Sequence, residues 1–182
     1  DGRMRHARSG TWWETAPQMA LANNSVSYTD KPDGETFLRE WTSLVESKSG
    51  ERGIFNRTAA QRQAKKYGRR DAEHDFGTNP CSEIILRPYQ FCNLTEVVIK
   101  ASDTPASIER KVQLATIMGT IQSTLTNFPY LRKIWKTNTE EERLLGVSLT
   151  GILDNQLLSR NDAYLEDTLT ALKQVAIDTN LE

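Results

Sequence analysis

The sequence predicts an α/β fold, in which helices cover a sheet or a barrel. Some segments show the alternation of apolar and polar residues that is typical of strands. Between them lie segments whose apolar residues recur at helical spacing. The 182 residues are enough for one domain, and no internal repeat or low-complexity stretch interrupts them. Periodicity alone leaves the choice between a barrel and an open sheet undecided.

The first half of the chain begins with residues 1–17, which are polar and basic and are expected to form a loop. Residues 25–29 alternate as in a strand, and residues 35–47 carry apolar side chains at helical spacing before a Ser-Gly stop. Residues 58–67 are polar and favour a helix, whereas residues 71–80 hold charges, a glycine and a proline. We expect a strand, two helices and a long loop.

The second half of the chain opens with two apolar, β-branched runs at residues 84–86 and 91–99, which predict extended structure. Thr104 and Pro105 then have the residue types of a helix N-cap and first helical position. One apolar stripe is predicted along this helix, formed by Ile108, Val112, Ala115, Met118, Ile121 and Leu125.

A Phe-Pro break at residues 128–129 ends that helix and is followed by a charged segment, residues 133–143. Residues 145–152 alternate as in a strand, and a closing helix begins at Ala163. This last helical pattern reaches Glu182 without a glycine or proline stop, and the chain starts at Asp1, so we expect an internal fragment of a longer protein.

The composition excludes several classes of function. A formal net charge of −1 gives no electrostatic reason to expect nucleic acid or an acidic membrane as partner. No apolar run approaches the roughly 20 residues of a membrane span, and no secretory signal is evident, so a cytoplasmic protein is expected. Glycine-rich phosphate loops are absent, and His6 and His74 are too far apart to suggest a local metal site.

The most informative stretch surrounds Cys81. Because Pro80 favours an extended backbone at Asn79, and alternate residues of an extended chain share one side, Asn79, Cys81 and Glu83 are predicted to face together. An amide, a thiol and a carboxylate that converge can combine sulfur chemistry with proton transfer. Spacing alone favours the alternative of a turn at Asn79 with a buried thiol and a solvated carboxylate, and it favours a core thiol at Cys92 over a redox partner.

Residues 79–83, Asn-Pro-Cys-Ser-Glu, followed by residues 90–98, Gln-Phe-Cys-Asn-Leu-Thr-Glu-Val-Val, resemble the active-site finger loop of ribonucleotide reductases. The resemblance extends to residues 22–26, 49–57 and 146–151, so that nearly the whole chain takes part. It is strongest to the adenosylcobalamin-dependent class II enzymes. The short separation of Cys81 and Cys92 favours that class over class I, whose members usually carry a longer insertion there.

The resemblance implies a ten-stranded α/β barrel, of which residues 1–182 are a single fragment carrying the finger loop at about residues 77–90. It implies that Cys81 forms the thiyl radical that abstracts the ribose 3′ hydrogen, that Glu83 takes the 3′ hydroxyl proton, and that Asn79 binds the ribose. Cys92 corresponds to one of two cysteines that become a disulfide, and its partner is expected outside the chain.

Four further residues are candidates for contact with the substrate nucleotide: Asn23, Asn24, Ser25 and Ser82. For the first three, a role as turn residues that satisfy backbone groups is an equal alternative. Ser82 stands where many members of the family have glycine, a change that affects the flexibility of the loop.

The resemblance also implies cofactors and partners. Adenosylcobalamin is the expected cofactor, with its site mostly outside the chain, and a ribonucleoside triphosphate is the expected substrate, with a diphosphate as the alternative. An allosteric nucleotide and a thioredoxin-like reductant are the other expected partners, and the fragment alone is expected to be inactive. The alternatives are a class I large subunit, a non-radical thiol oxidoreductase and a noncatalytic nucleotide-binding domain.

Overall fold

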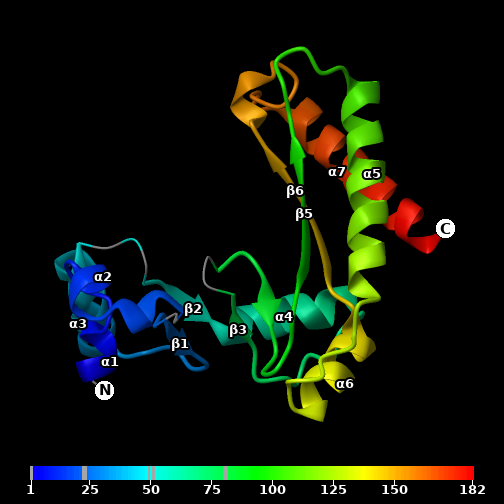
Figure 1. Ribbon diagram of the computed structural model, residues 1–182. Helices are drawn as coiled ribbons and strands as arrows, with labels where there is room; N and C mark the ends of the chain where they lie inside the picture. Colours follow the sequence, from blue (N-terminus) through cyan, green and yellow to red (C-terminus); the bar gives the residue numbers. More distant parts are fainter. Residues whose placement is uncertain (1, 22–23, 49, 51, 80–81) are drawn as a thin grey trace. The chain divides into compact units, whose positions relative to one another are not determined.

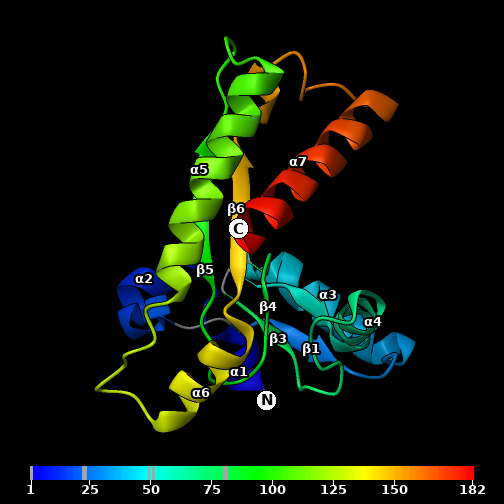
Figure 2. The same ribbon diagram turned by 90° about the vertical axis from the view of Figure 1, so that its right-hand side faces the viewer.

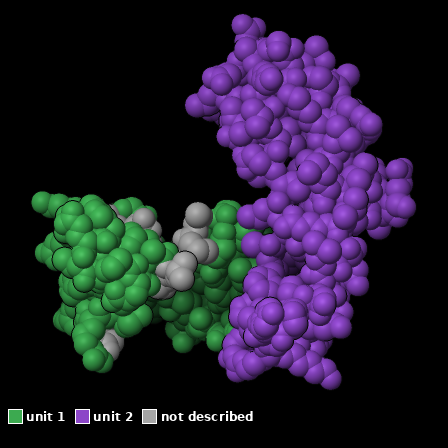
Figure 3. All heavy atoms as spheres, in the orientation of Figure 1, with its two compact units in different colours: residues 1–88 green, residues 89–182 purple. Residues whose placement is uncertain are grey.

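A computed structural model describes residues 2–21, 24–48, 50, 52–79 and 82–182 (Figure 1). The chain divides into two compact units, unit 1 (residues 1–88) and unit 2 (residues 89–182), which are coloured separately in Figure 3. Both units combine helices with short sheets, which confirms the predicted mixture of helix and sheet. The two units are described separately below.

Unit 1 begins with helical turns and continues with strands that alternate with helices. Its elements are α1 (Gly2–His6), α2 (Trp12–Thr15), η1 (Pro17–Leu21), β1 (Val26–Tyr28), α3 (Gly34–Ser47), β2 (Ile54–Asn56), α4 (Arg57–Tyr67), β3 (Gly77–Thr78) and β4 (Ile85–Leu86). The loop predicted for residues 1–17 is wrong, because helical turns form there: Arg5 pairs with Glu40 of a distant segment, and a local contact places Arg8 4.2 Å from the ring centre of Trp12.

Strands β1 and β2 are parallel, with Val26 opposite Ile54 and Tyr28 opposite Asn56. Helix α3 forms the connection that a parallel pair requires, and the Asp33 carboxylate caps its start by accepting a hydrogen bond from the Thr36 amide. The strand and helix predicted for residues 25–29 and 35–47 are therefore confirmed.

The burial of α3 is the reverse of what its apolar spacing suggests. Its buried residues are Glu40, Ser43 and Ser47. Its large apolar side chains are exposed, namely Phe37, Leu38, Trp41 and Val45. The polar face is buried because charged groups of α1 and of the segment before β2 bind it. The apolar face has no cover in the described part of the chain.

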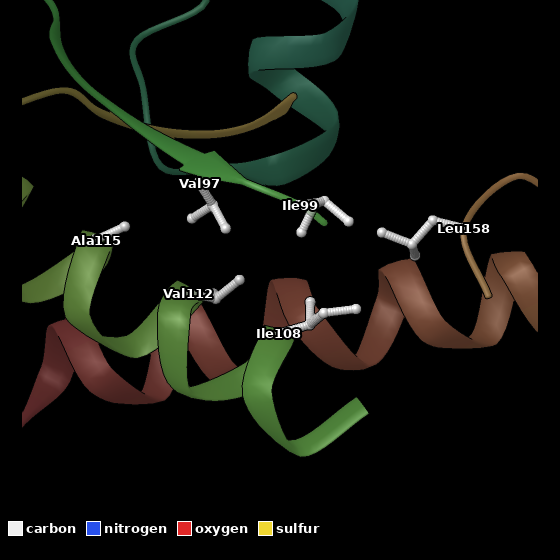
Figure 4. Packing of buried hydrophobic residues seen from close by; sticks show 6 residues of the cluster. All are labelled: Val97, Ile99, Ile108, Val112, Ala115 and Leu158. Carbon is white, nitrogen blue, oxygen red and sulfur yellow. The ribbon is translucent and has the colours of Figure 1, made fainter. Parts of the chain in front are cut away.

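Unit 2 is built on one parallel strand pair and the helix that connects its strands (Figure 2). Its elements are β5 (Asn93–Val98), α5 (Pro105–Ser123), α6 (Lys133–Glu142), β6 (Leu145–Thr150), η2 (Ile152–Asp154) and α7 (Ala163–Leu181). Helix α5 packs against both strands and against α7. Val97 and Ile99 point from the β5 segment towards Ile108 and Val112 of α5, which forms the core shown in Figure 4.

The start of α5 is as predicted, and the predicted apolar stripe is buried at Ile108, Val112 and Ala115 but not beyond them. Thr104 caps the helix in a reciprocal pair of hydrogen bonds with Ser107, and Pro105 is the first helical residue. The buried face continues from Ala115 through small residues, namely Thr116, Gly119 and Ser123. The predicted Met118 and Ile121 are exposed because steps of three residues carry them around the helix, away from the sheet, and Leu125 is exposed beyond the end of the helix at Ser123.

The described strands form three sheets of two strands each, so the predicted ten-stranded barrel is not seen. Within the described residues, the outer edges of β1–β2 and of β5–β6 have no neighbouring strand. Isolated parallel pairs are unusual, because parallel sheets are normally larger and covered on both faces. Among the described helices, none has the length and apolar character that crossing a bilayer requires.

Candidate functional site

The predicted finger loop contains an antiparallel hairpin formed by β3 and β4, with Gly77 opposite Leu86 and Thr78 opposite Ile85. Its base is fixed at Phe76, whose side chain is fully buried. The Phe76 carbonyl accepts a hydrogen bond from Arg57 Nε at 2.7 Å, and Arg70 lies over the Phe76 ring while donating to the Ile85 carbonyl at 2.8 Å. Two arginines thereby tie both strands of the hairpin to α4 and the segment that follows it.

Asn79 and Glu83 meet at the tip of this hairpin. The Asn79 side-chain amide donates to Glu83 Oε1, and Asn79 Oδ1 accepts from the Ile84 amide at 3.0 Å. The Ser82 amide donates to the Asn79 carbonyl at 3.1 Å. Asn79 and Glu83 therefore converge across a reversal of the chain, and not along one side of an extended strand as predicted. Cys81 and Pro80 lie outside the described residues.

Ser82 lies beside this pair in a backbone conformation that favours glycine. Its φ is 66°, in the left-handed region that costs a residue with a Cβ atom about 1 kcal/mol or more. Its hydroxyl lies 3.5 Å from Thr78 Oγ1, across the hairpin tip. Both Ser82 and Glu83 are exposed, so the polar side chains of the tip lie at the surface of unit 1.

The structure also brings Ser25 close to Ser82. A methyl group placed on Gly53 would lie 3.4 Å from Ser25 Oγ and 4.0 Å from Ser82 Oγ. Both hydroxyls therefore border the same residue, Gly53, immediately before β2. Ser25, before β1, and Ser82, at the hairpin tip, were both predicted to contact the substrate, and they lie near the same residue.

Asn24 and Ser25 also make structural hydrogen bonds. Asn24 Nδ2 donates to the Met4 carbonyl at 2.9 Å, and Ser25 Oγ accepts from the Gly53 amide at 2.9 Å. These contacts match the alternative in which such residues satisfy backbone groups. Asn24 Oδ1 is buried without a hydrogen-bond partner in the described structure. Asn23 lies outside the described residues.

A buried ion pair supports the segment that carries Ser25, and sequence reasoning missed it. Arg52 donates to Glu40 Oε1, to Ser43 Oγ at 2.8 Å and to the Asn24 carbonyl at 3.4 Å. Burial raises the pKa of Glu40, but hydrogen bonds from Arg52 and Arg5 outweigh this effect and lower the pKa below its ordinary value. Glu40 lies among polar residues of α3 and Arg52 lies outside that helix, so no local pattern in the sequence indicated the pair.

Cys92 lies in unit 2, immediately before β5, and is half-buried. The next residue, Asn93, is buried and donates to the Leu144 carbonyl from both its backbone amide and its side-chain amide, each at 3.0 Å. This pairing anchors the start of β5 beside β6. Cys92 therefore follows a loop and precedes a fixed strand, as its position at the head of an apolar run predicted.

A separate cavity of about 540 Å³ opens in unit 1, and none of the candidate residues lines it. Its walls include Tyr28, Phe37, Phe55, Lys31 and Arg62. Within the described residues, no three histidine, cysteine, aspartate or glutamate side chains are grouped as a metal site requires. The candidate chemistry in the described structure therefore depends on the hairpin tip, its neighbour Ser25, and Cys92.

Comparison with known proteins finds sequence similarity to a ribonucleoside-triphosphate reductase. The chain is 31% identical over 137 residues, 73% of its length, to the adenosylcobalamin-dependent ribonucleoside-triphosphate reductase of Lacticaseibacillus paracasei. The matched region is only 17% of that enzyme's length. No family model matches the chain, and no solved structure matches it significantly. The similarity supports a distant relationship between this chain and ribonucleotide reductases.

Proposed function

We propose that this chain is part of the catalytic subunit of a ribonucleotide reductase and carries its radical cysteine, Cys81. The observation that carries the proposal is the pairing of Asn79 with Glu83 at the tip of an anchored hairpin, on either side of Cys81 in sequence. An amide and a carboxylate held together, with a cysteine between them in the sequence, provide groups for orienting a ribose and for moving its hydroxyl proton. The similarity to a reductase over most of the chain supports the same function.

The incomplete sheets support the view that the chain is a segment of a larger α/β domain. The outer edges of both parallel pairs are unpaired within the described residues, and an unpaired edge is where a further strand adds to a sheet. The uncovered apolar faces of α3 and α5 add large exposed side chains, which favour burial against further protein. In this proposal the β1–β2 and β5–β6 pairs belong to one barrel that surrounds the β3–β4 hairpin.

In the proposed reaction the Cys81 thiyl radical removes the hydrogen atom bound to C3′ of the substrate. A sulfur radical suits this step, because no acid or base removes an unactivated carbon-bound hydrogen. Glu83 accepts the proton of the 3′ hydroxyl, which eases loss of the 2′ hydroxyl, and Asn79 hydrogen-bonds the ribose. Because Asn79 also bonds to the Glu83 carboxylate and the Ile84 amide, it fixes that carboxylate relative to the turn.

The net reaction requires two further thiols, of which Cys92 is one and a cysteine outside the chain is the other. The C2′–O bond breaks and the oxygen leaves as water, while a C2′–H bond forms. The two thiols supply two electrons and two protons and are joined as a disulfide, which a dithiol of a thioredoxin-like protein reduces for the next turnover. The Cys81 radical is regenerated when hydrogen returns to C3′.

The described residues do not form a site for adenosylcobalamin. A corrinoid is larger than the ligands that cavities of about 540 Å³ enclose, and the cavity in unit 1 contains none of the candidate residues. In this proposal most of the cofactor site belongs to parts of the full-length protein outside residues 1–182. A triphosphate substrate and an allosteric nucleotide also belong to the proposal for the full-length protein.

Nucleotide reduction by the anaerobic full-length protein tests the proposal. Deoxynucleotide formation that needs adenosylcobalamin and disappears in Cys81→Ser supports it, and comparison of tri- and diphosphate substrates identifies the substrate. Activity that requires a separate metal-radical subunit would replace the cobalamin assignment with class I. Activity unaffected by Cys81→Ser would overturn the proposed mechanism.

A further inference from the structure

The residues on both sides of Cys92 are held by side-chain contacts. Gln90, two positions before the thiol, is buried and donates from Nε2 to Glu142 at the end of α6. Asn93, directly after the thiol, is bound to the Leu144 carbonyl by two hydrogen bonds. Glu142 and Leu144 are two residues apart, so one short segment at the end of α6 holds the chain before and after Cys92.

An aromatic cluster adds a third attachment. The ring of Phe91, directly before Cys92, lies 4.7 Å from that of Trp135 at an angle of 31° and 5.0 Å from that of Phe128. Tyr89 packs edge-on against Trp135 at 5.8 Å, and the Arg132 guanidinium lies 4.4 Å from the Tyr89 ring centre. Helix α6 thus contacts the Cys92 segment through Trp135 in its first turn and Glu142 in its last.

We infer that α6 positions the Cys92 thiol for disulfide formation, with Trp135 and Glu142 as the positioning residues. The inference rests on the proposed function and extends it to a helix that the sequence showed only as a charged segment. Thiol oxidation requires the two sulfur atoms to meet within a narrow geometry, so a small displacement of the Cys92 backbone slows it. The 3′ hydrogen abstraction by Cys81 does not require Cys92, so the two steps respond differently to changes in α6.

Four variants of the full-length protein, one of them a matched control, test the inference. Trp135→Leu removes the aromatic contact with Phe91. Glu142→Leu removes the acceptor for Gln90, whereas Glu142→Gln keeps an oxygen that accepts the same hydrogen bond. Thr137→Ala, an exposed position on the same helix, is the matched control. Two quantities are measured: Cys81-dependent exchange of the substrate 3′ hydrogen, and the rate at which pre-reduced protein forms the Cys92 disulfide in one turnover, read by differential alkylation and mass spectrometry.

We expect Trp135→Leu and Glu142→Leu to form the disulfide at about one tenth of the wild-type rate or below. Their 3′ hydrogen exchange should stay close to that of the wild type. Glu142→Gln and Thr137→Ala should match the wild type in both quantities. Equal losses in exchange and disulfide formation would show a general structural role and overturn the inference, as would wild-type disulfide formation in both leucine variants. A wild-type protein that makes no deoxynucleotide would overturn the proposed function and this inference together.

Discussion

Gly151 follows β6 at a position where a side chain meets the backbone of the neighbouring strand segment. Its φ is +73°, and a Cβ atom there would lie 2.5 Å from the Ile99 carbonyl oxygen. Ile99 is buried, and its amide pairs with the Thr150 carbonyl, so this oxygen cannot rotate away as a flexible side chain does. In Gly151→Ala, the left-handed backbone costs about 1–2 kcal/mol. The backbone shift that separates the new Cβ atom from the Ile99 carbonyl oxygen costs about 1–3 kcal/mol more.

Gly68 provides the control, because its φ is +65° and a Cβ atom there meets nothing within 4 Å. Gly68→Ala should therefore lose only the backbone contribution, about 1–2 kcal/mol. Native-state hydrogen exchange on the full-length protein measures both losses locally, at the amides of β5 and β6 for Gly151 and at the end of α4 for Gly68. Equal losses in the two variants would refute the argument that the close approach to Ile99 makes Gly151 necessary.

Four further outcomes follow from the charges and the hairpin tip. Glu40→Gln should destabilise unit 1 by about 3–5 kcal/mol, because it leaves Arg52 buried without a counter-charge, and an unchanged urea midpoint would contradict this. Because the pKa of Glu40 is lowered in the folded state, its contribution to stability should be complete above the ordinary pKa of 4.5 and be lost as the pH falls through the lowered value, which a pH series of unfolding midpoints measures. The pKa of Asp103 is lowered to about 2, first of all by the hydrogen bond from Lys111, so Lys111→Met should raise it towards 3.8 in an NMR titration, and an unmoved titration would exclude that cause. Ser82→Gly should relieve the left-handed strain and increase hydrogen-exchange protection at the hairpin, whereas a loss of protection would show that the Ser82 hydroxyl contact matters more.

The strands and helices of the chain were largely predictable, because local chemistry determines them. Thr104 and Pro105 marked the start of α5, and the alternation at residues 145–152 marked β6, since caps and alternating burial leave a direct pattern in the sequence. The convergence of Asn79 and Glu83 was predicted as well, although by the wrong backbone conformation. A turn with a left-handed residue at Ser82 leaves little trace in a sequence that has serine and not glycine there.

Tertiary contacts explain what the sequence did not predict. Helix α3 has a clear apolar face, yet its polar face is buried, because Arg5 and Arg52 reach Glu40 from segments distant in sequence. Helix α6 is rich in charge, and its importance for Cys92 depends on contacts of Trp135 and Glu142 that no local pattern shows. Such contacts join residues far apart in the chain, so no local pattern in the sequence indicates them.

Cleavage of the substrate C3′–H bond tests the central claim most directly. Full-length protein supplied with adenosylcobalamin and a ribonucleotide carrying deuterium at C3′ should reduce it more slowly than the unlabelled substrate, and should exchange hydrogen at C3′ only while Cys81 is present. Cys81→Ser should abolish both the exchange and the reduction. Hydrogen exchange at C3′ that persists in Cys81→Ser, or reduction without any isotope effect or exchange, would contradict the assignment of Cys81 as the radical residue.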